Sequence, residues 1–346
     1  MATFEDAKQI LVNEIPFIEF TVDHTAIIES VASLLLEVFP DSVNPTFEQF
    51  TDGITNKLIK CTFESRNELQ CFLVRAYGKK TEILINREQE FLNAICLHKR
   101  GLGPHILCRF TNGFIYVYIE GQPYTLIDLQ DPSSAFPVAR KMAEWHMSKF
   151  SANPTPSLFV NLWKWMNAIP EKYENTKTQD KFQIHIDIGS LATHLRALES
   201  KLKKLNSPVV FCHNDLLSGN IIRTTEGIAF IDFEYASYNY RGFDIANHFC
   251  EYAGFQCDYS KFPSERDQRL WLLEYTSSIG RNEDIDKIFR EVEFFTLASH
   301  FFWGLWGLLQ AQNSDIDFNY MDYAIKRFQI FFKSYAALED KNERGK

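Results

Sequence analysis

The chain has 346 residues and a formal net charge of −9, and 45% of its residues are hydrophobic and 23% are charged. This composition predicts a soluble globular protein that is long enough for two domains, and the acidic balance argues against a nucleic-acid partner. The 7 cysteines include no C-x-x-C pair, so we expect reduced thiols in a cytoplasmic protein, and neither a disulfide framework nor a zinc site.

The chain begins with a predicted short strand at 15–20 and a predicted helix at 26–38, where apolar residues recur at helical spacing. Residues 47–61 then predict two strands joined by a turn at Asp52-Gly53. This turn is either a plain hairpin turn or a loop that covers phosphates, since Gly53 lets backbone N–H groups approach an anion. The second interpretation involves Asp52, Gly53, Ile54, Thr55, Asn56 and Lys57.

The next two elements offer an ion pair between a strand arginine and a helix glutamate. The predicted strand at 69–77 carries Arg75, and the predicted helix at 86–99 offers Glu88 and Glu90. We favour Glu90 as the partner of Arg75. A solvated surface position is the alternative for either glutamate.

The domain boundary is predicted near Gln122. A strand at 114–119 ends just before it, so we expect an N-terminal unit, 1–121, and a C-terminal unit, 122–346. Apolar periodicity in the second unit predicts helices at 134–150, 158–173, 188–205, 264–278, 282–312 and 318–336. A polar loop at 172–181 and a disordered tail at 339–346 complete the prediction.

One apolar stretch, 294–311, is long enough to suggest a membrane span. It contains the polar residues Ser299, His300 and Gln310. We therefore predict a buried helix of a folded protein and no membrane insertion.

The most informative stretch is 209–222, where a polar loop lies between two apolar runs that predict strands. The loop holds His213-Asn214-Asp215, and Asn220 follows five residues after the aspartate. A further predicted strand at 228–231 ends in Asp232. Three side chains with oxygen atoms therefore lie at the ends of neighbouring short strands.

Phosphoryl transfer from ATP requires this set of side chains. Asp215 would accept or orient the proton of an attacking hydroxyl, while Asn220 and Asp232 would hold Mg²⁺ against the phosphates. Protein kinases use the same spacing, with arginine at the position of Asn214 and glycine at that of Glu234. The alternative is a polar turn whose side chains cap the local backbone, but the flanking strands favour the catalytic interpretation.

The same comparison assigns a nucleotide site. In protein kinases a basic residue at the position of Arg75 pairs with the phosphates and with a helix glutamate, here Glu90. The strand edge that would bond the adenine through its backbone comprises Val117, Tyr118 and Ile119, and we add Leu217 to the nucleotide site.

Aromatic residues near the C-terminus form either a core stripe or the wall of a pocket for an ammonium group. Carboxylates and further rings would complete such a pocket. The candidates are Tyr235, Asp244, Glu251, Trp303, Trp306, Phe318 and Tyr323. Asp244 has two other interpretations, as a brace that accepts N–H bonds from the catalytic loop or as an ordinary helix cap.

Taken together, the motifs at 213–220, 231–236, 238–249 and 300–306 resemble the signatures of the choline/ethanolamine kinase family, and the resemblance covers about residues 45–335. It implies an α+β, two-lobed, protein-kinase-like fold of the choline kinase/aminoglycoside phosphotransferase type. The small β-rich lobe, 1–121, would bind ATP, and the large mainly helical lobe, 122–346, would bind Mg²⁺ and a small amino alcohol. Choline-branch members are often dimers, so a homodimer is an expectation.

Within that family the stretches at 51–58, 77–82 and 251–254 are similar to the ethanolamine branch. They imply phosphorylation of ethanolamine to phosphoethanolamine, the first step of the CDP-ethanolamine route to phosphatidylethanolamine. Residues 232–234 and 240–244 look more like the choline branch, so choline, or both alcohols, is the alternative. A catalytically inactive kinase-like binding module and a kinase of larger cationic substrates are the other hypotheses.

Overall fold

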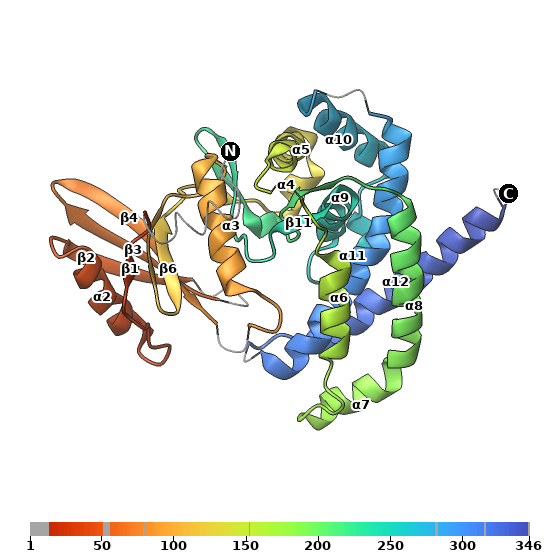
Figure 1. The fold of residues 1–346 in the computed structure, drawn as a ribbon, viewed down its shortest axis with the longest axis horizontal. Coiled ribbons are helices and arrows are strands. Elements are labelled where there is room, and N and C mark those ends of the chain that lie inside the picture. Colours follow the sequence, from red (N-terminus) through yellow and green to blue (C-terminus); the bar gives the residue numbers. More distant parts are fainter. Residues whose placement is uncertain are drawn as a thin grey trace. The chain divides into compact units, whose positions relative to one another are not determined.

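The computed structural model describes residues 14–50, 56–78, 81–151, 153–280, 283–314 and 316–344. Four residues of the expected phosphate-covering turn, 52–55, lie outside this described part. The chain divides into two compact units, Met1–Gly121 and Gln122–Lys346. Strands dominate the first unit and helices the second (Figure 1).

The described strands of the first unit form one sheet in the order β1-β5-β6-β4-β3-β2. The strands are β1 (Phe17–Ile18), β2 (Val43–Phe50), β3 (Asn56–Ser65), β4 (Glu68–Tyr77), β5 (Ile106–Phe110) and β6 (Gly113–Val117). Only β1 and β5 pair in parallel among these neighbours. Arg66 and Asn67, both with positive φ, form the two-residue turn between β3 and β4, which is the turn geometry that suits the twist of a hairpin.

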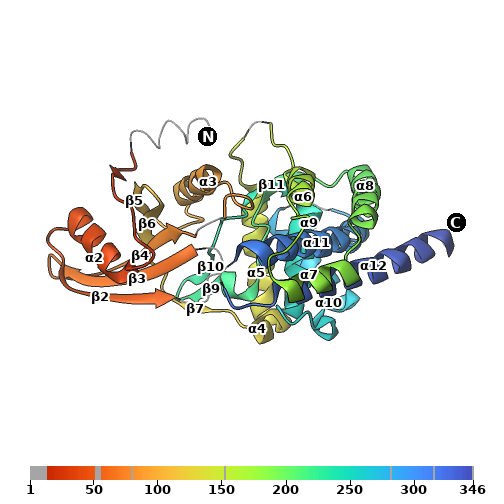
Figure 2. The same ribbon diagram turned by 90° about the horizontal axis from the view of Figure 1, so that it is seen from below.

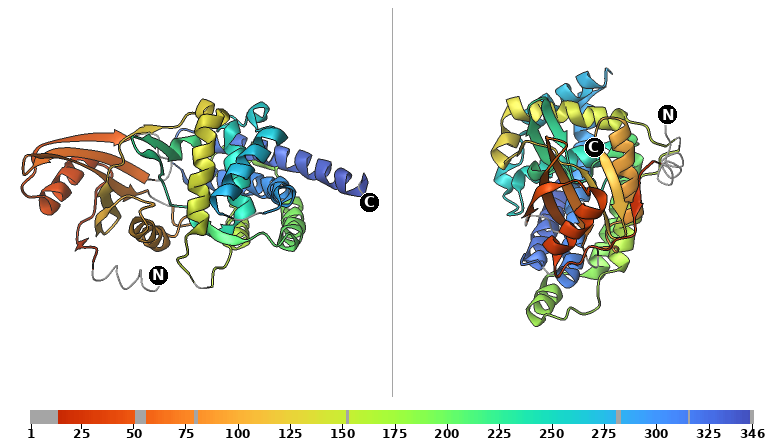
Figure 3. Two further views of the ribbon diagram at one scale, coloured as in Figure 1. Left: turned by 90° about the horizontal axis from the view of Figure 1, so that it is seen from above. Right: turned by 90° about the vertical axis from the view of Figure 1, so that its left-hand side faces the viewer.

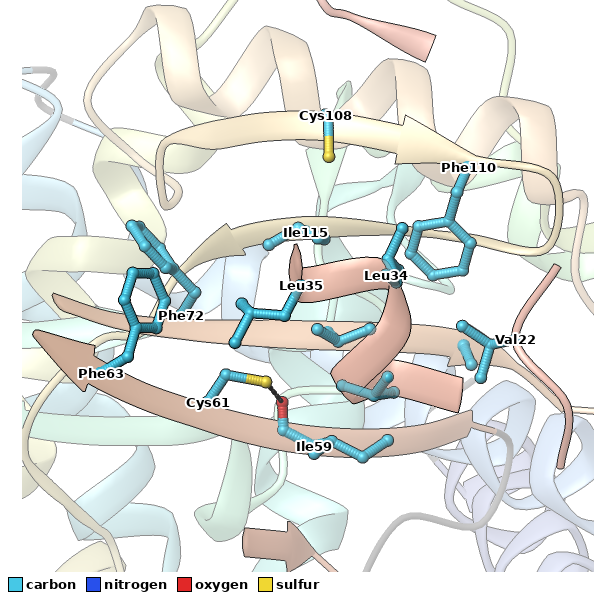
Figure 4. Packing of buried hydrophobic residues seen from close by; sticks show 13 residues of the cluster. Val22, Leu34, Leu35, Ile59, Cys61, Phe63, Phe72, Cys108, Phe110 and Ile115 are labelled. Atoms are coloured by element: carbon cyan, nitrogen blue, oxygen red, sulfur yellow. Dashed lines mark hydrogen bonds between the residues drawn. The ribbon is translucent and has the colours of Figure 1, made fainter. Parts of the chain in front are cut away.

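Helix α2 (Ile27–Val38) covers one face of this sheet, as Figure 4 shows. Its buried residues Leu34 and Leu35 pack with Ile59, Cys61 and Phe63, which alternate along β3 and therefore point to the same face. The sequence predicted this helix because its apolar residues recur at helical spacing, and the prediction is confirmed.

Helix α3 (Arg87–Lys99) is also confirmed. Asn86 caps its first turn by accepting a hydrogen bond from the Gln89 N–H (3.1 Å), and Gly101 follows its end with a φ of +67°. Residues 90–97 are all buried, so the helix holds the Glu90 side chain inside the unit.

The second unit is mainly helical and contains two small sheets (Figure 2). The helices are α4 (Leu126–Gln130), α5 (Pro132–Met147), α6 (Leu158–Asn167), α7 (Thr176–His185), α8 (Ile188–Lys204), α9 (Arg241–Cys250), α10 (Glu265–Ser278), α11 (Ile285–Asn313) and α12 (Tyr320–Arg344). Helix α11 packs against both α9 and α12, and α12 is the dark-blue helix that leads to the C-terminus in Figure 3.

Short strands place the predicted catalytic loop. Strand β8 (Val209–Cys212) pairs with β11 (Ser237–Tyr240), and β9 (Ile221–Thr224) pairs with both β10 (Gly227–Phe230) and β7 (Gln122–Pro123), all antiparallel. The loop between β8 and β9 ends in a short 3-10 turn, η1 (Ser218–Asn220). The sequence did not predict β11, whose alternation is masked by a run of polar and aromatic residues.

Several predicted boundaries are wrong. Helix α5 begins at Pro132, before the expected 134, because Asp131 caps it, and it ends at Met147. The stretch 172–181, predicted as a loop, contains the start of α7. Asn175 caps that helix and Phe182, its buried residue, packs on the Tyr173 ring at 5.0 Å between centroids.

Two further predictions, for the C-terminal tail and for the last strand of the first unit, also need correction. The tail at 339–346 was expected to be disordered, but α12 continues to Arg344, and Glu339 forms an ion pair with Lys201. Strand β6 ends at Val117, so Tyr118 and Ile119 lie beyond the strand.

Helix α11 contains the apolar stretch that was long enough to cross a membrane. Among the described residues it is the one helix that meets this criterion by length and composition, and most of its apolar window is buried inside the protein. The prediction that it is a buried helix is confirmed.

Candidate active site

His213 opens the predicted catalytic loop, which joins β8 to β9, and ties it to the end of β10. Its Nε2 lies 2.9 Å from the Ile231 carbonyl, while the Asp215 N–H points at its Nδ1 from 3.3 Å. One ring nitrogen therefore donates and the other accepts, which is the pattern of a neutral imidazole. Burial lowers the pKa of His213, in agreement with that neutral form.

Asp244, in the first turn of α9, holds this loop in place through hydrogen bonds to its backbone. It accepts hydrogen bonds from the backbone N–H groups of His213 (2.9 Å) and Asn214 (2.7 Å), and its Oδ2 lies 2.9 Å from His146 Nε2. Burial alone would raise the pKa of the Asp244 carboxyl, but the His146 bond and the loop N–H groups hold it below its usual value. The bracing interpretation is confirmed. A substrate-binding role is not supported, because both oxygens of this 1% exposed residue are already engaged.

Asn214 has a positive φ of 65°, a strained region that asparagine tolerates better than most residues. Its Nδ2 donates to the Tyr235 carbonyl (2.8 Å) and to Ser237 Oγ (2.9 Å), and its Oδ1 accepts from Asn239 Nδ2 (2.9 Å). These bonds over-determine the strained conformation, which is what allows strain to persist at a functional site.

The three side chains singled out by the sequence lie close together. Asn220 Nδ2 donates to the Asp215 carbonyl (2.8 Å), and the Ile231 N–H donates to the Asn220 carbonyl (3.0 Å). Asp232 follows directly, with a φ of +61°. Burial raises the pKa of Asp215 well above its usual value, and the carboxylates of Glu251, Asp232 and Glu234 raise it further. The loop therefore concentrates negative charge around Asp215.

Aromatic rings form a second cluster in the same unit. The Trp303 ring lies 5.6 Å from Tyr235 and 5.4 Å from Trp306, edge to face in both cases. Trp303 Nε1 donates to Asn247 Oδ1 (2.7 Å), and Trp306 Nε1 donates to the Tyr235 hydroxyl (2.8 Å). Both indole N–H groups are thus satisfied, and the rings are fixed in orientation.

The C-terminal end of α11 and the start of α12 extend this cluster. The Tyr323 ring lies 6.0 Å from Trp306 and 5.8 Å from Phe318. Glu251, in the 3-10 turn η2 (Glu251–Ala253), adjoins the cluster through Arg327. Arg327 Nη1 lies 3.6 Å from Glu251 Oε1, and the Arg327 guanidinium lies over the Tyr323 ring at 5.7 Å from its centroid. The structure therefore brings together the residues of the predicted pocket, with Asp244 as the exception.

The first unit contains the predicted ion pair. Arg75 Nη2 lies 2.8 Å from Glu90 Oε1, and Arg87 Nη1 lies 2.7 Å from Glu90 Oε2. Glu88 is exposed, so the preference for Glu90 is confirmed. Of the two described residues at the edge of the turn, Asn56 is buried and Lys57 is exposed.

The strand edge assigned to adenine is partly occupied by the sheet itself. The Val117 N–H donates to the His105 carbonyl (2.8 Å), and the Tyr118 N–H donates to the Cys71 carbonyl (3.1 Å). A ligand at this edge would therefore use the backbone of Ile119 or the carbonyl groups.

Comparison with known proteins now identifies the fold and the family. A family model described as choline/ethanolamine kinase matches residues 47–332. The chain belongs to the choline/ethanolamine kinase family. It is 37% identical over 300 residues to the probable ethanolamine kinase A of Dictyostelium discoideum, which covers 84% of this chain and 85% of that protein.

Solved structures agree with this assignment. The Plasmodium vivax ethanolamine kinase superposes with a TM-score of 0.81 at 30% identity, over 96% of this chain and 94% of that one. The aminoglycoside phosphotransferase APH(2'')-Ib, at 12% identity and a TM-score of 0.55, covers 88% of this chain and 96% of its own and shows the fold alone. The predicted family and protein-kinase-like fold class are confirmed.

Three residues of the site were missed by the sequence analysis: His146, Asn247 and Arg327. Each is buried and lies on the core-facing side of a helix. A polar side chain at an apolar helix position was the available signal, because burying such a group is costly unless partners satisfy it.

Proposed function

We propose that this protein transfers the γ-phosphoryl group of ATP to the hydroxyl of ethanolamine. The observation that carries the proposal is the braced loop with Asp215, Asn220 and Asp232 in the same unit as a cluster of indole and phenol rings bordered by Glu251. The product, phosphoethanolamine, would enter the CDP-ethanolamine route. Relatives named ethanolamine kinase over most of the chain support the substrate.

In the reaction, the substrate oxygen attacks the γ-phosphorus and the bond to the β-phosphate oxygen of the leaving ADP breaks. Asp215 orients the hydroxyl and accepts its proton. Burial and the neighbouring carboxylates raise its pKa, which makes the ionised carboxylate a stronger base. An incoming cationic substrate offsets the negative charge that surrounds it.

Asn220 and Asp232 are the residues that would hold Mg²⁺. Carboxylate and amide oxygens are the ligands that this ion prefers, and the Asn220 Nδ2 bond to Asp215 leaves the amide oxygen for another partner. When bound, the ion would neutralise charge on the phosphates. The donor set therefore fits the ion.

The first unit would bind the nucleotide. Arg75, held by Glu90, supplies positive charge for phosphates. The other positions that we propose for the nucleotide are 52–57 and 117–119 in this unit, and Leu217 in the second unit.

The substrate ammonium would bind between the aromatic cluster and Glu251. Tryptophan and tyrosine faces attract any ammonium, including the quaternary group of choline. Choline is therefore the second candidate, favoured by the ring cluster of Tyr235, Trp303 and Trp306.

Location and assembly follow as further proposals. The 7 cysteines are all free, which suits a reducing cytoplasm. A homodimer is proposed from the choline branch, and light scattering after size-exclusion chromatography would measure it.

The test of the function is a coupled ADP-release assay with Mg·ATP and ethanolamine, with the product identified by phosphorus NMR. We expect stoichiometric phosphoethanolamine and ADP. ADP release that is independent of any added alcohol, or no turnover with either alcohol, would reject the proposal and favour a kinase-like binding module.

A further inference from the structure

Arg327 is a buried cation in α12, with 2% of its surface exposed. Its Nη2 donates to the carbonyl (3.1 Å) and to the Oγ (2.9 Å) of Ser299 in α11. Gly304 permits this close approach of the two helices, since a Cβ there would lie 2.7 Å from the Phe328 ring. A cation in such a position is costly unless a carboxylate compensates it.

The compensating carboxylate is Glu251, but the pair is not closed. Arg327 Nη1 lies 3.6 Å from Glu251 Oε1, which is an ion-pair distance but too long for a hydrogen bond. Glu251 is only 6% exposed, and among the described residues its Oε1 has no hydrogen-bond partner. A buried oxygen left in this state points to a further partner such as a ligand.

The position of this oxygen relates it to the substrate site. The Arg327 guanidinium lies over the Tyr323 ring at 5.7 Å from its centroid, and Tyr323 in turn contacts Trp306 at 6.0 Å. Burial raises the pKa of Asp215, and the Glu251 carboxylate raises it further. Glu251 therefore adjoins the aromatic cluster through Arg327, and its charge acts on Asp215.

A second set of contacts fixes Arg327 relative to the loop. Ser299 Oγ, which accepts from Arg327, donates to Asn247 Oδ1 (2.8 Å). The same Oδ1 accepts from Trp303 Nε1 (2.7 Å), and Asn247 Nδ2 donates to the Asn214 carbonyl (3.1 Å). The cation, the indole and the loop thus share one hydrogen-bonded frame.

We propose that Arg327 is a positioning residue that selects a primary ammonium. It holds Glu251 as an ionised carboxylate and engages it only loosely, so that Oε1 can accept an N–H of the substrate. The inference rests on the proposed function and deepens it. Because ethanolamine carries N–H donors and the trimethylammonium of choline carries none, the contact through Glu251 favours ethanolamine.

The experiment compares Arg327→Met, Arg327→Lys and Glu251→Gln with the wild type, each assayed with ethanolamine and with choline. For Arg327→Met we expect KM for ethanolamine to rise about tenfold or more, the loss of one charged hydrogen bond, with kcat within about threefold and choline KM nearly unchanged. Arg327→Lys keeps the charge, so it should fall between the wild type and Arg327→Met.

The double variant Arg327→Met/Glu251→Gln isolates the coupling. Since both residues act through one oxygen, adding the second change should raise KM by less than about threefold. The proposal would be overturned if the two changes multiplied their effects on KM for ethanolamine. It would also be overturned if the variants raised KM equally for ethanolamine and for choline.

A matched control is Arg241→Met, which opens another buried arginine pair of the same unit, with Glu291 and Glu283. It should lower stability and leave the ethanolamine-to-choline ratio unchanged. If Arg327→Met does not fold, Arg327→Lys and Glu251→Gln still decide the question.

Wild-type turnover separates the two hypotheses. A wild type that phosphorylates only choline rejects the proposed function. A wild type that prefers ethanolamine, with Arg327→Met unchanged in both KM values, rejects the role of Arg327 alone.

Discussion

Each unit contains a buried arginine–glutamate pair, and the two pairs differ in how closely the arginine approaches the carboxylate. In the first unit both oxygens of Glu90 are held, by Arg75 at 2.8 Å and by Arg87 at 2.7 Å. In the second unit Glu251 faces Arg327 at 3.6 Å, and its Oε1 makes no hydrogen bond with a described residue. Each oxygen of the first carboxylate therefore has an arginine nitrogen within 2.8 Å, whereas the arginine of the second pair stays at a longer distance and leaves more room for a third partner.

The charges differ in the same sense. In the first unit two arginines, Arg75 and Arg87, converge on Glu90, and guanidinium groups suit phosphate oxygens. In the second unit burial raises the pKa of Asp215 and the carboxylates of Glu251, Asp232 and Glu234 raise it further, and negative charge of this kind suits an ammonium. In the closely spaced pair, Glu90 holds the arginines in position. In the loosely spaced pair, the Glu251 carboxylate can also bind a substrate cation.

The largest effect on turnover is expected for a change at Asp215. Asp215→Asn should lower kcat by about 10³-fold, within the range for removal of a general base, with little change in either KM. Stability should not fall, because burial disfavours the charged carboxylate of Asp215. Steady-state kinetics and thermal melts measure both. The control Glu226→Gln, in the exposed β9–β10 turn, should behave as wild type, and a kcat near normal for Asp215→Asn would exclude its catalytic role.

Opening the closed pair is the next test. Glu90→Gln removes a buried counter-charge that lies within 2.8 Å of both Arg75 and Arg87, and we expect kcat/KM for ATP to fall about thirtyfold. The ratio of ethanolamine to choline turnover should stay constant, because this cluster is proposed to serve the nucleotide. The matched variant is Glu88→Gln on the exposed face of α3. Equal effects of the two changes would show that the ion pair is irrelevant.

Acid should affect the second unit more than the first. Burial lowers the pKa of His248 from 6.5 to about 4, so the unfolded chain binds the proton first. The folded state is therefore favoured most when His248 is neutral. This contribution to the free energy of unfolding is complete above about pH 6.5 and is lost as pH falls towards about 4. The resulting drop is about 2 kcal/mol between about pH 7.5 and about pH 5.

Tryptophan fluorescence during denaturant unfolding would measure this loss, since all 6 tryptophans lie in the second unit. His248→Asn keeps a donor for the Leu216 carbonyl, which His248 Nδ1 contacts at 2.8 Å, and removes the titration. The variant should lose less stability on acidification. An unchanged pH dependence would show that other groups are responsible.

The smallest effect concerns the aromatic cluster. Trp306→Phe keeps a ring but removes the N–H bond to the Tyr235 hydroxyl, so we expect KM for both alcohols to rise about threefold. Trp163→Phe removes a comparable bond to Glu199 on the outer helices and should have no effect. A larger loss for ethanolamine than for choline would contradict the division of roles between rings and carboxylate.

Local patterns made parts of this molecule predictable. Helices α2 and α3 follow from apolar spacing and a capping Asn86, and the loop of Asp215 and Asn220 follows from a polar stretch between two strands. Such features depend on residues that are near in sequence, so the sequence contains the full signal.

The remaining features depend on contacts between distant residues. Helix α7 is stabilised by Phe182 packing on Tyr173, and Arg327 depends on partners in α11 and η2. Asp244 was assigned both to the substrate and to the loop, and only its bonds to His146 and the loop N–H groups decide between them. Periodicity describes which face of a helix is buried, but not which partner it meets.

The most direct test of the central claim is a competition assay in which ethanolamine and choline are offered together to the wild type and to Glu251→Gln. If the open carboxylate selects the primary ammonium, the wild type should prefer ethanolamine by tenfold or more in kcat/KM, about 1.4 kcal/mol, and Glu251→Gln should lose most of that preference. A wild-type preference for choline, or a ratio that Glu251→Gln leaves unchanged, would contradict the account.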